Sequence, residues 1–160
     1  MKHYFAYGTF LDEAAMRAFA PSARPEGILR LEGYELAFGE THRTGKGGCF
    51  LLAKPGAVTY GVQYVLSDED MQRMDEASGV PEGLWVHKDI EAVDAEGRPV
   101  STLTYTIPGT PPPFRPGPDY VGKILKGLGE LDLPADYVAR VKAILAAGQL
   151  EAEQSTPRLS

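Results

Sequence analysis

A short segment near the N-terminus has the residue types of a site that binds an anion. Residues 3–11 read His-Tyr-Phe-Ala-Tyr-Gly-Thr-Phe-Leu, an apolar run that stops at Gly8, continues with the hydroxyl of Thr9 and leads into a helical pattern. A strand that ends at glycine and turns into a helix leaves backbone N–H groups without partners, all pointing at one spot. Such a spot can hold a carboxylate or a developing oxyanion. The plainer interpretation is a strand-to-helix turn with no ligand.

The histidines and the cysteine do not indicate a metal or thiol site. His3, His42 and His87 are scattered, without ligand spacing such as H-x-x-x-H, so we expect no bound metal. Cys49 is the one cysteine, and it stands in an apolar run next to Phe50 with no base close by in the sequence. We interpret Cys49 as a small buried hydrophobic residue. A single cysteine allows no intramolecular disulfide, which fits a reducing compartment.

The length of the chain favours a single domain, and its negative charge argues against binding to nucleic acid or membranes. The chain has 160 residues, 43% of them apolar, and a net charge of −6. This is enough to bury one core, and the negative charge argues against binding to nucleic acid or to an anionic membrane surface. No apolar run approaches the ~20 residues of a membrane span, and the N-terminus does not resemble a secretory signal. We expect a cytoplasmic protein, and its oligomeric state is left open.

The elements that must position these residues are mostly strands with helices inserted between them. We expect strands over residues 2–7, 27–38 with a bend at Gly33, 49–53, 58–66, 84–94 and 100–107, with a turn at Pro55-Gly56. We expect helices over residues 12–20, 118–131 and 134–147, and one that begins at Ser67, where an acid follows three residues later, and ends at Gly79. The alternating strands indicate an α+β fold with a mixed or antiparallel sheet. We expect one domain over residues 1–148 and a loose polar tail over 149–160.

Several segments together resemble the γ-glutamyl cyclotransferase family. Residues 7–11, Tyr-Gly-Thr-Phe-Leu, resemble its Y-G-[ST]-N-L opening. In the family's order there follow a G-G-hydrophobic run at 47–50, a G-V-hydrophobic strand at 61–65, a counterpart of its L-D-x-x-E-G segment at 74–80, and tyrosines at Tyr105 and Tyr120. The resemblance covers roughly residues 3–147. It implies a small, partly open β-barrel with flanking helices.

The resemblance also implies a reaction, the release of 5-oxoproline from a small γ-glutamyl amide or dipeptide. The α-amine of the substrate attacks its own γ-carbonyl, so the chemistry needs no metal, cofactor or protein nucleophile. The protein must hold the substrate in a ring-closing pose, stabilise the oxyanion and transfer a proton. The substrate-binding residues that the resemblance implies are Tyr7, Gly8, Thr9, Phe10, Leu11, Gly48, Tyr105 and Tyr120. Phe10 replaces the usual Asn of the family, so one polar amide is lost. The six prolines of residues 108–118 are expected to form a stiff wall of the site.

The position of the family's proton-transferring Glu holds Ser78 when the segments are aligned without gaps. A serine hydroxyl cannot replace a carboxylate as a base unless another base activates it. Glu82, which precedes a glycine, would take the role after a four-residue slip, but Met74-Asp75 matches the family's L-D only without that slip. Glu76 is the weaker candidate, because two residues along a helix rotate a side chain by roughly 200°.

Three functions therefore remain open. The first is a γ-glutamyl cyclotransferase-like enzyme. The second is a catalytically impaired or repurposed member that binds a small amino-acid-like ligand or a partner, for which Ser78 is the motivation. The third is a structural or interaction domain with no small-molecule site.

Overall fold

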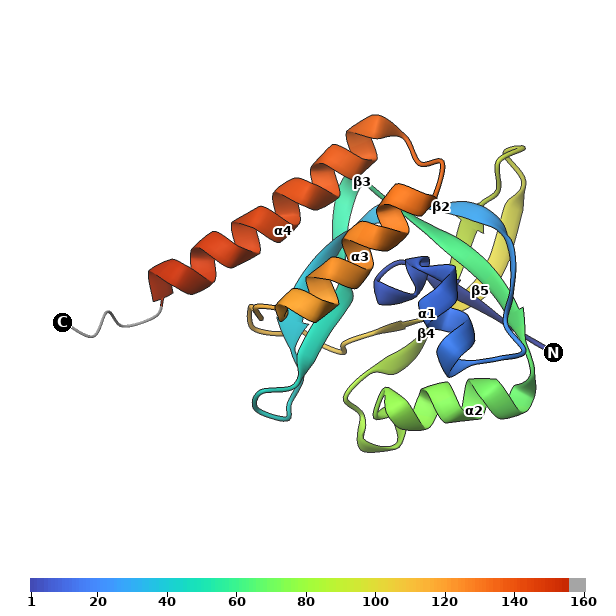
Figure 1. The fold of residues 1–160 in the computed structure, drawn as a ribbon, viewed down its shortest axis with the longest axis horizontal. Coiled ribbons are helices and arrows are strands. Elements are labelled where there is room, and N and C mark those ends of the chain that lie inside the picture. The colour runs from blue at the N-terminus through green and yellow to red at the C-terminus, as the bar shows by residue number, and fades with distance from the viewer. Residues whose placement is uncertain (156–160) are drawn as a thin grey trace.

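The fold is built on one antiparallel sheet. The structure, a computed structural model, describes the backbone of residues 1–155 and the side chains of residues 1–147. Within that range the strands are β1 (Lys2–Ala6), β2 (Arg24–Glu40), β3 (Gly47–Leu66), β4 (Val86–Val93) and β5 (Pro99–Thr106), in the sheet order β1-β3-β2-β4-β5. All of their pairings are antiparallel. The helices are α1 (Glu13–Phe19), α2 (Asp68–Ala77), α3 (Pro118–Glu130) and α4 (Ala135–Ser155), with 3-10 turns η1 (Thr9–Leu11) and η2 (Val80–Glu82). Figure 1 shows α2 and α4 on opposite sides of the view.

Side chains join the two outer strands of the sheet, where a closed barrel would use a backbone ladder. Thr104 Oγ1 in β5 donates to the carbonyl of Phe5 in β1 at 2.7 Å. The Tyr7 hydroxyl, just after β1, donates to the carbonyl of Tyr105 at 2.7 Å. The expected α+β fold is confirmed, and the barrel is open between β1 and β5, whose backbones are not paired in a ladder.

The two long strands β2 and β3 are irregular at the same level of the sheet. Gly33 has a φ of +86°, and the pairing shifts there from Glu32 opposite Val58 to Tyr34 opposite Ala53. The expected bend at Gly33 is therefore confirmed. The expected turn between two separate strands is wrong, because residues 54–57 form an excursion inside β3 and β2 pairs with β3 on both sides of it.

The helix α2 has the boundaries that its sequence predicts. Ser67 Oγ accepts the backbone N–H of Asp70 at 3.1 Å, which caps the N-terminus. Gly79, with a φ of +69°, follows the helix and reverses the chain. Met71 and Met74 are buried and fix the inner face of the helix. The helix thereby places Asp75 and Ser78 near the ends of β4 and β5.

A buried carboxylate ties the start of α2 to the loop that follows α1. Asp70 accepts the backbone N–H of Ser22 at 2.9 Å, the hydroxyl of Ser22 and the guanidinium of Arg73. The Ser22 hydrogen bond and the Arg73 charge lower the pKa of Asp70 from 3.8 to about 2. The carboxylate is ionised at neutral pH and holds the two segments together.

The C-terminal helix is longer than expected. α4 continues to Ser155, whereas the sequence pattern places its end at residue 147. The residues after Gly148, Gln-Leu-Glu-Ala-Glu-Gln-Ser, include good helix formers and no proline. The domain boundary at residue 148 stays a prediction, and residues 156–160 lie outside the described residues. No helix in the described part of the chain combines the length and apolar character needed to span a membrane.

Candidate functional site

A cavity of about 290 Å³ lies where β1 ends. The turn η1, the start of β3, the end of α2, the two strands β4 and β5 and the helix α3 supply or adjoin its walls. The lining residues are Tyr4, Tyr7, Gly8, Thr9, Phe10, Lys46, Gly47, Cys49, Ala77, Ser78, Trp85, Tyr105 and Tyr120. Segments from most of the chain therefore meet at the position that the N-terminal motif predicts.

The turn after β1 packs closely against β3. A Cβ atom at Gly8 would lie 2.9 Å from the Sγ of Cys49, so a larger residue would push the two segments apart. The Tyr64 hydroxyl donates to the carbonyl of Phe10 at 2.8 Å and fixes the turn from the other side. The first backbone N–H groups of a helical turn have no acceptor within it. Gly8, Thr9 and Phe10 thus contribute donors close to the cavity.

Tyr120 and Trp85 hold the opposite wall. The backbone N–H of Cys49 donates to the hydroxyl oxygen of Tyr120 at 2.8 Å, and Trp85 Nε1 donates to the carbonyl of Cys49 at 3.0 Å. A Cβ atom at Gly48 would lie only 2.6 Å from the Tyr120 oxygen. Gly48 was predicted to contact substrate, but it is not among the lining residues. It provides the space in which the Tyr120 hydroxyl lies.

Tyr105 connects the cavity with α2. Its ring packs against Tyr4, with ring centroids 5.4 Å apart, and its carbonyl accepts the Tyr7 hydroxyl. Its own hydroxyl donates to Asp75 Oδ1. Tyr105 is therefore shared between the cavity wall and a carboxylate that does not line the cavity.

Among the residues that the structure describes, the cavity wall contains hydrogen-bond donors and no carboxylate. Burial raises the pKa of each of the four lining tyrosines, so all four phenols are protonated at neutral pH. Burial also raises the pKa of Cys49 to about 12, so its thiol is neutral. Lys46 is the one charged side chain among the lining residues of the described part of the chain, and it is exposed. The wall suits a ligand with carbonyl or carboxylate oxygens.

Most of the predicted site residues come together. Tyr7, Gly8, Thr9, Phe10, Ser78, Tyr105 and Tyr120 all line the cavity. Leu11 does not, because its side chain is buried against Gly127 of α3. Cys49 is buried, as its apolar neighbours predict.

The two candidate acids lie outside the cavity. Glu76 is exposed on α2, and Glu82 is exposed on η2, a turn held between Gly79 and Gly83, which both have positive φ. The carbonyl of Glu82 accepts His42 Nε2 at 2.8 Å. Neither carboxylate is among the described residues that line the cavity.

The proline-rich segment packs behind the cavity and does not line it. Its backbone pairs with the end of β2, where Glu40 N–H donates to the carbonyl of Pro112 at 2.8 Å. The rings of Pro111 and Phe114 fill the space beside Gly39 and Gly47. At this side of the cavity the lining residue is Gly47 at the start of β3, and Phe114 of the proline-rich segment packs against it.

Several lining residues were missed by the sequence analysis, namely Tyr4, Lys46, Gly47, Cys49, Ala77 and Trp85. Four of them adjoin a residue of a predicted segment or belong to one, so the motifs could have been extended by a position. Tyr4 also lies in the N-terminal segment of residues 3–11, but it was expected only as part of the strand. Trp85 belonged to no motif, since an aromatic residue in a strand is most simply a core residue.

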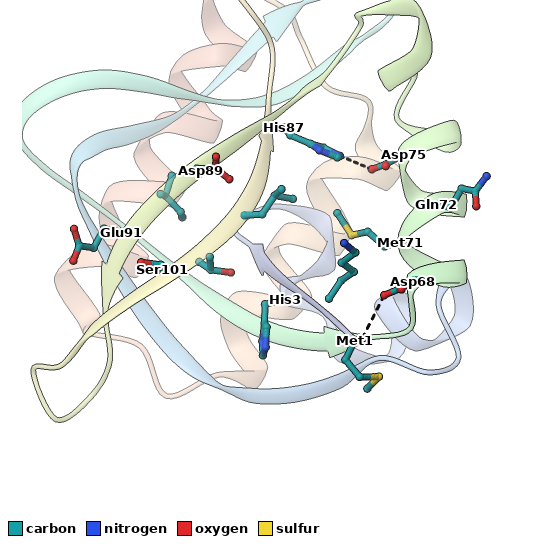
Figure 2. A pocket seen from close by; sticks show the side chains of 14 residues that line it. Met1, His3, Asp68, Met71, Gln72, Asp75, His87, Asp89, Glu91 and Ser101 are labelled. Carbon is teal, nitrogen blue, oxygen red and sulfur yellow. Dashed lines mark hydrogen bonds and ion pairs between the residues drawn. The ribbon is translucent and has the colours of Figure 1, made fainter.

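A second, larger hollow of about 770 Å³ lies between the N-terminus, α2, β4 and β5 (Figure 2). Asp75 and His87 face each other at one end of it, with Asp75 Oδ1 and His87 Nε2 2.7 Å apart. At the other end the N-terminal amine lies 3.4 Å from Asp68. Asp75 thus lines this hollow while it holds the hydroxyl of a tyrosine from the cavity.

Comparison with known proteins agrees with this architecture. A model of the AIG2-like family matches residues 58–141. The human protein Gamma-glutamylcyclotransferase is 30% identical over 146 residues, which cover 88% of this chain and 77% of the human protein. The chain belongs to the AIG2-like family of γ-glutamylcyclotransferase-like proteins. A relative from Bos taurus with the same name is 27% identical over 146 residues, with the same coverage of both chains.

The fold of this AIG2-like protein also matches a solved structure of a Gamma-glutamyl cyclotransferase. The TM-score is 0.81 at 28% identity, with 89% of this chain and 87% of the other covered. The family resemblance carried by residues 7–11 and the later segments is thereby confirmed.

Proposed function

We propose that this AIG2-like protein releases 5-oxoproline from a small γ-glutamyl amide or dipeptide. The observation that carries the proposal is the cavity at the end of β1, which brings the N-terminal turn, Ser78 and two tyrosines to one place. In the reaction the α-amine of the substrate attacks its γ-carbonyl, and an amine leaves. The protein's part is to hold the chain folded and to stabilise charge on the carbonyl oxygen.

The composition of the wall supports binding of a glutamyl head. Main-chain donors near Thr9 can donate to the oxygens of the ligand, and the exposed ammonium of Lys46 can pair with a carboxylate. The volume of about 290 Å³ suits a molecule of amino-acid or dipeptide size. The substrate supplies its own nucleophile, so this chemistry needs no cofactor.

One observation favours a second function, the binding of an amino-acid-like ligand without turnover. Ser78 lines the cavity and is aligned with the family's Glu, and no carboxylate is among the lining residues within the described range. A neutral wall can bind a γ-glutamyl compound but has no evident group to accept the proton of its ammonium.

The purified protein should be incubated with a panel of γ-glutamyl dipeptides and γ-glutamyl amines, and 5-oxoproline should be measured. Release of 5-oxoproline from at least one compound supports the enzyme. Binding of the same compounds, measured by calorimetry, without any release supports the second function. If the protein neither releases 5-oxoproline nor binds any compound of the panel, both proposed functions are ruled out.

A further inference from the structure

We propose that Asp75, acting through Tyr105, makes the cavity select ligands that carry an ammonium group. Asp75 is a positioning residue, because it does not line the cavity and contacts the cavity wall through the hydroxyl of Tyr105. The inference rests on the proposed function for the identity of the ligand head. No described lining residue offers a carboxylate to the α-amine of such a ligand. The inference names the Tyr105 oxygen, backed by Asp75, as the group that recognises this amine.

The contacts that carry the proposal join β5, α2 and β4. The Tyr105 hydroxyl donates to Asp75 Oδ1, and His87 Nε2 lies 2.7 Å from the same oxygen. Figure 2 shows the Asp75 and His87 side chains directed at one another. Tyr105 and His87 are direct partners in the β4–β5 ladder, so the sheet presents both to the same face of α2.

This arrangement decides the direction of the hydrogen bonds. A carboxylate can only accept, so the phenol proton of Tyr105 is committed to Asp75, and Nε2 of His87 carries a proton as well. The Tyr105 oxygen is left with lone pairs and no further proton. A ligand group that reaches this oxygen from the cavity finds an acceptor, which matches an ammonium group with three donors and no acceptor.

The charge of Asp75 works in the same direction. Its side chain is 25% exposed, so it is screened less than a surface carboxylate. Burial and the nearby Asp75 carboxylate raise the pKa of Tyr105, which keeps the phenol protonated. A cation beside the Tyr105 oxygen is stabilised by the negative charge one hydrogen bond away, whereas a neutral ligand gains little.

The helix α2 links the Asp75–Tyr105 pair to Ser78, the residue aligned with the family's Glu. Asp75 precedes Ser78 by three residues, so the two lie on neighbouring positions of one helix face, about 5–6 Å apart between Cβ atoms. Ser78 lines the cavity and Asp75 stands behind it. One helix would thus set both the ammonium contact and the residue at the family's Glu position.

Two ligands that differ only in the ammonium group test the proposal. L-glutamine carries the α-amine, and glutaramic acid is the same molecule without it. Affinities for both should be measured by calorimetry on the full chain, for the wild type, Asp75→Asn, Tyr105→Phe and the double variant. His87→Gln and Glu76→Gln serve as controls, because the first changes the other partner of Asp75 and the second removes an exposed charge from the same helix.

We expect Asp75→Asn and Tyr105→Phe each to weaken L-glutamine binding about 10-fold or more, as for loss of a hydrogen bond to a charged group. Glutaramic acid binding should change less than about twofold. The double variant should be no weaker for glutamine than Tyr105→Phe, since both act through one oxygen. Thermal unfolding checks that each variant is folded. If Asp75→Asn does not fold, the result for Tyr105→Phe alone decides the test.

Equal losses for both ligands would mean a structural role and would overturn the proposal. Unchanged affinities, or losses that multiply in the double variant, would overturn it too, as would a wild type that does not bind L-glutamine. Selective loss of glutamine binding by a protein that releases no 5-oxoproline would support this inference while the proposed enzyme fails. The two claims are therefore separable.

Discussion

The hydroxyl oxygen of Tyr120 accepts the backbone N–H of Cys49 at 2.8 Å, and this contact joins α3 to the start of β3. The two residues are 71 positions apart in the chain. Gly48 leaves the space in which that oxygen lies. The rear wall of the cavity therefore depends on one phenol, one glycine and one backbone amide that only the folded chain brings together.

Tyr120→Phe should lower both stability and ligand binding. The change leaves the Cys49 N–H without its acceptor, which costs about 1–3 kcal/mol of the free energy of unfolding. Urea denaturation measures the loss, and calorimetry with L-glutamine measures binding. Tyr137→Phe is the matched control, because its hydroxyl makes a long contact of 3.4 Å with the carbonyl of Tyr60, away from the cavity. Equal effects of the two substitutions would contradict the role of Tyr120.

Two glycines of α3 should respond in opposite directions to alanine. A Cβ atom at Gly127 would lie 2.6 Å from Leu11 Cβ and 2.7 Å from the backbone nitrogen of Asp12. Gly127→Ala should therefore destabilise the protein by about 1–3 kcal/mol by forcing α3 off the turn. Gly122 has nothing within 4 Å of such an atom, so Gly122→Ala should stabilise the helix by about 0.5–1 kcal/mol. Urea denaturation distinguishes them, and a loss of stability in both would argue against the close approach at Gly127.

Asp70 should make stability depend on pH in the acid range. Its pKa is lowered from 3.8 to about 2 in the folded state, so the stabilisation is complete above pH 4 and disappears as the pH falls from about 4 to about 2. Asp70→Asn should lower the free energy of unfolding by about 1–3 kcal/mol at pH 7 through the lost contacts with Ser22 and Arg73. Urea denaturation at pH 7 and near pH 2.5 should show a smaller difference at the lower pH. A difference that stays constant would show that ionised Asp70 does not tie α2 to the loop.

Ser78→Glu should increase the release of 5-oxoproline from γ-glutamyl compounds. A carboxylate at the end of α2 would supply a proton acceptor to a cavity whose lining has none, and such groups typically contribute about 10²–10⁴-fold to a rate. Ser78→Gln is the matched control, since it has a similar size and no basic oxygen. Comparable rates for the glutamate and glutamine variants, with the fold intact, would show that position 78 does not serve proton transfer.

The sequence predicted local structure best where a single residue determines it. Ser67 marks the start of α2, Gly79 its end, and Gly33 the bend in β2, because capping and positive φ are local properties. Pro55-Gly56 was wrongly predicted as a turn between strands. Those residues leave the ladder, but the long pairing of β2 and β3 continues beyond them, and that pairing depends on residues far away in the chain.

The site was predictable in outline for a similar reason. Residues 7–10 form a contiguous motif, so they could be found without the fold, whereas Trp85, just before β4, joins the wall through a hydrogen bond to the carbonyl of Cys49, 36 residues earlier in the chain. The role of Asp75 could not be read from its position, since its partner Tyr105 lies 30 residues further along the chain. Glu82 was a candidate because it precedes a glycine, but it is exposed on η2 and is not among the described residues that line the cavity.

A crystal structure of the protein with 5-oxoproline tests the central claim most directly. The claim is that the cavity at the end of β1 receives the glutamyl head of a ligand. Electron density for the ring should then lie among Thr9, Ser78 and Tyr105, with the ring's oxygens toward the backbone amides of the turn. Density for the ligand only outside this cavity, at a concentration that calorimetry shows to be saturating, would contradict it.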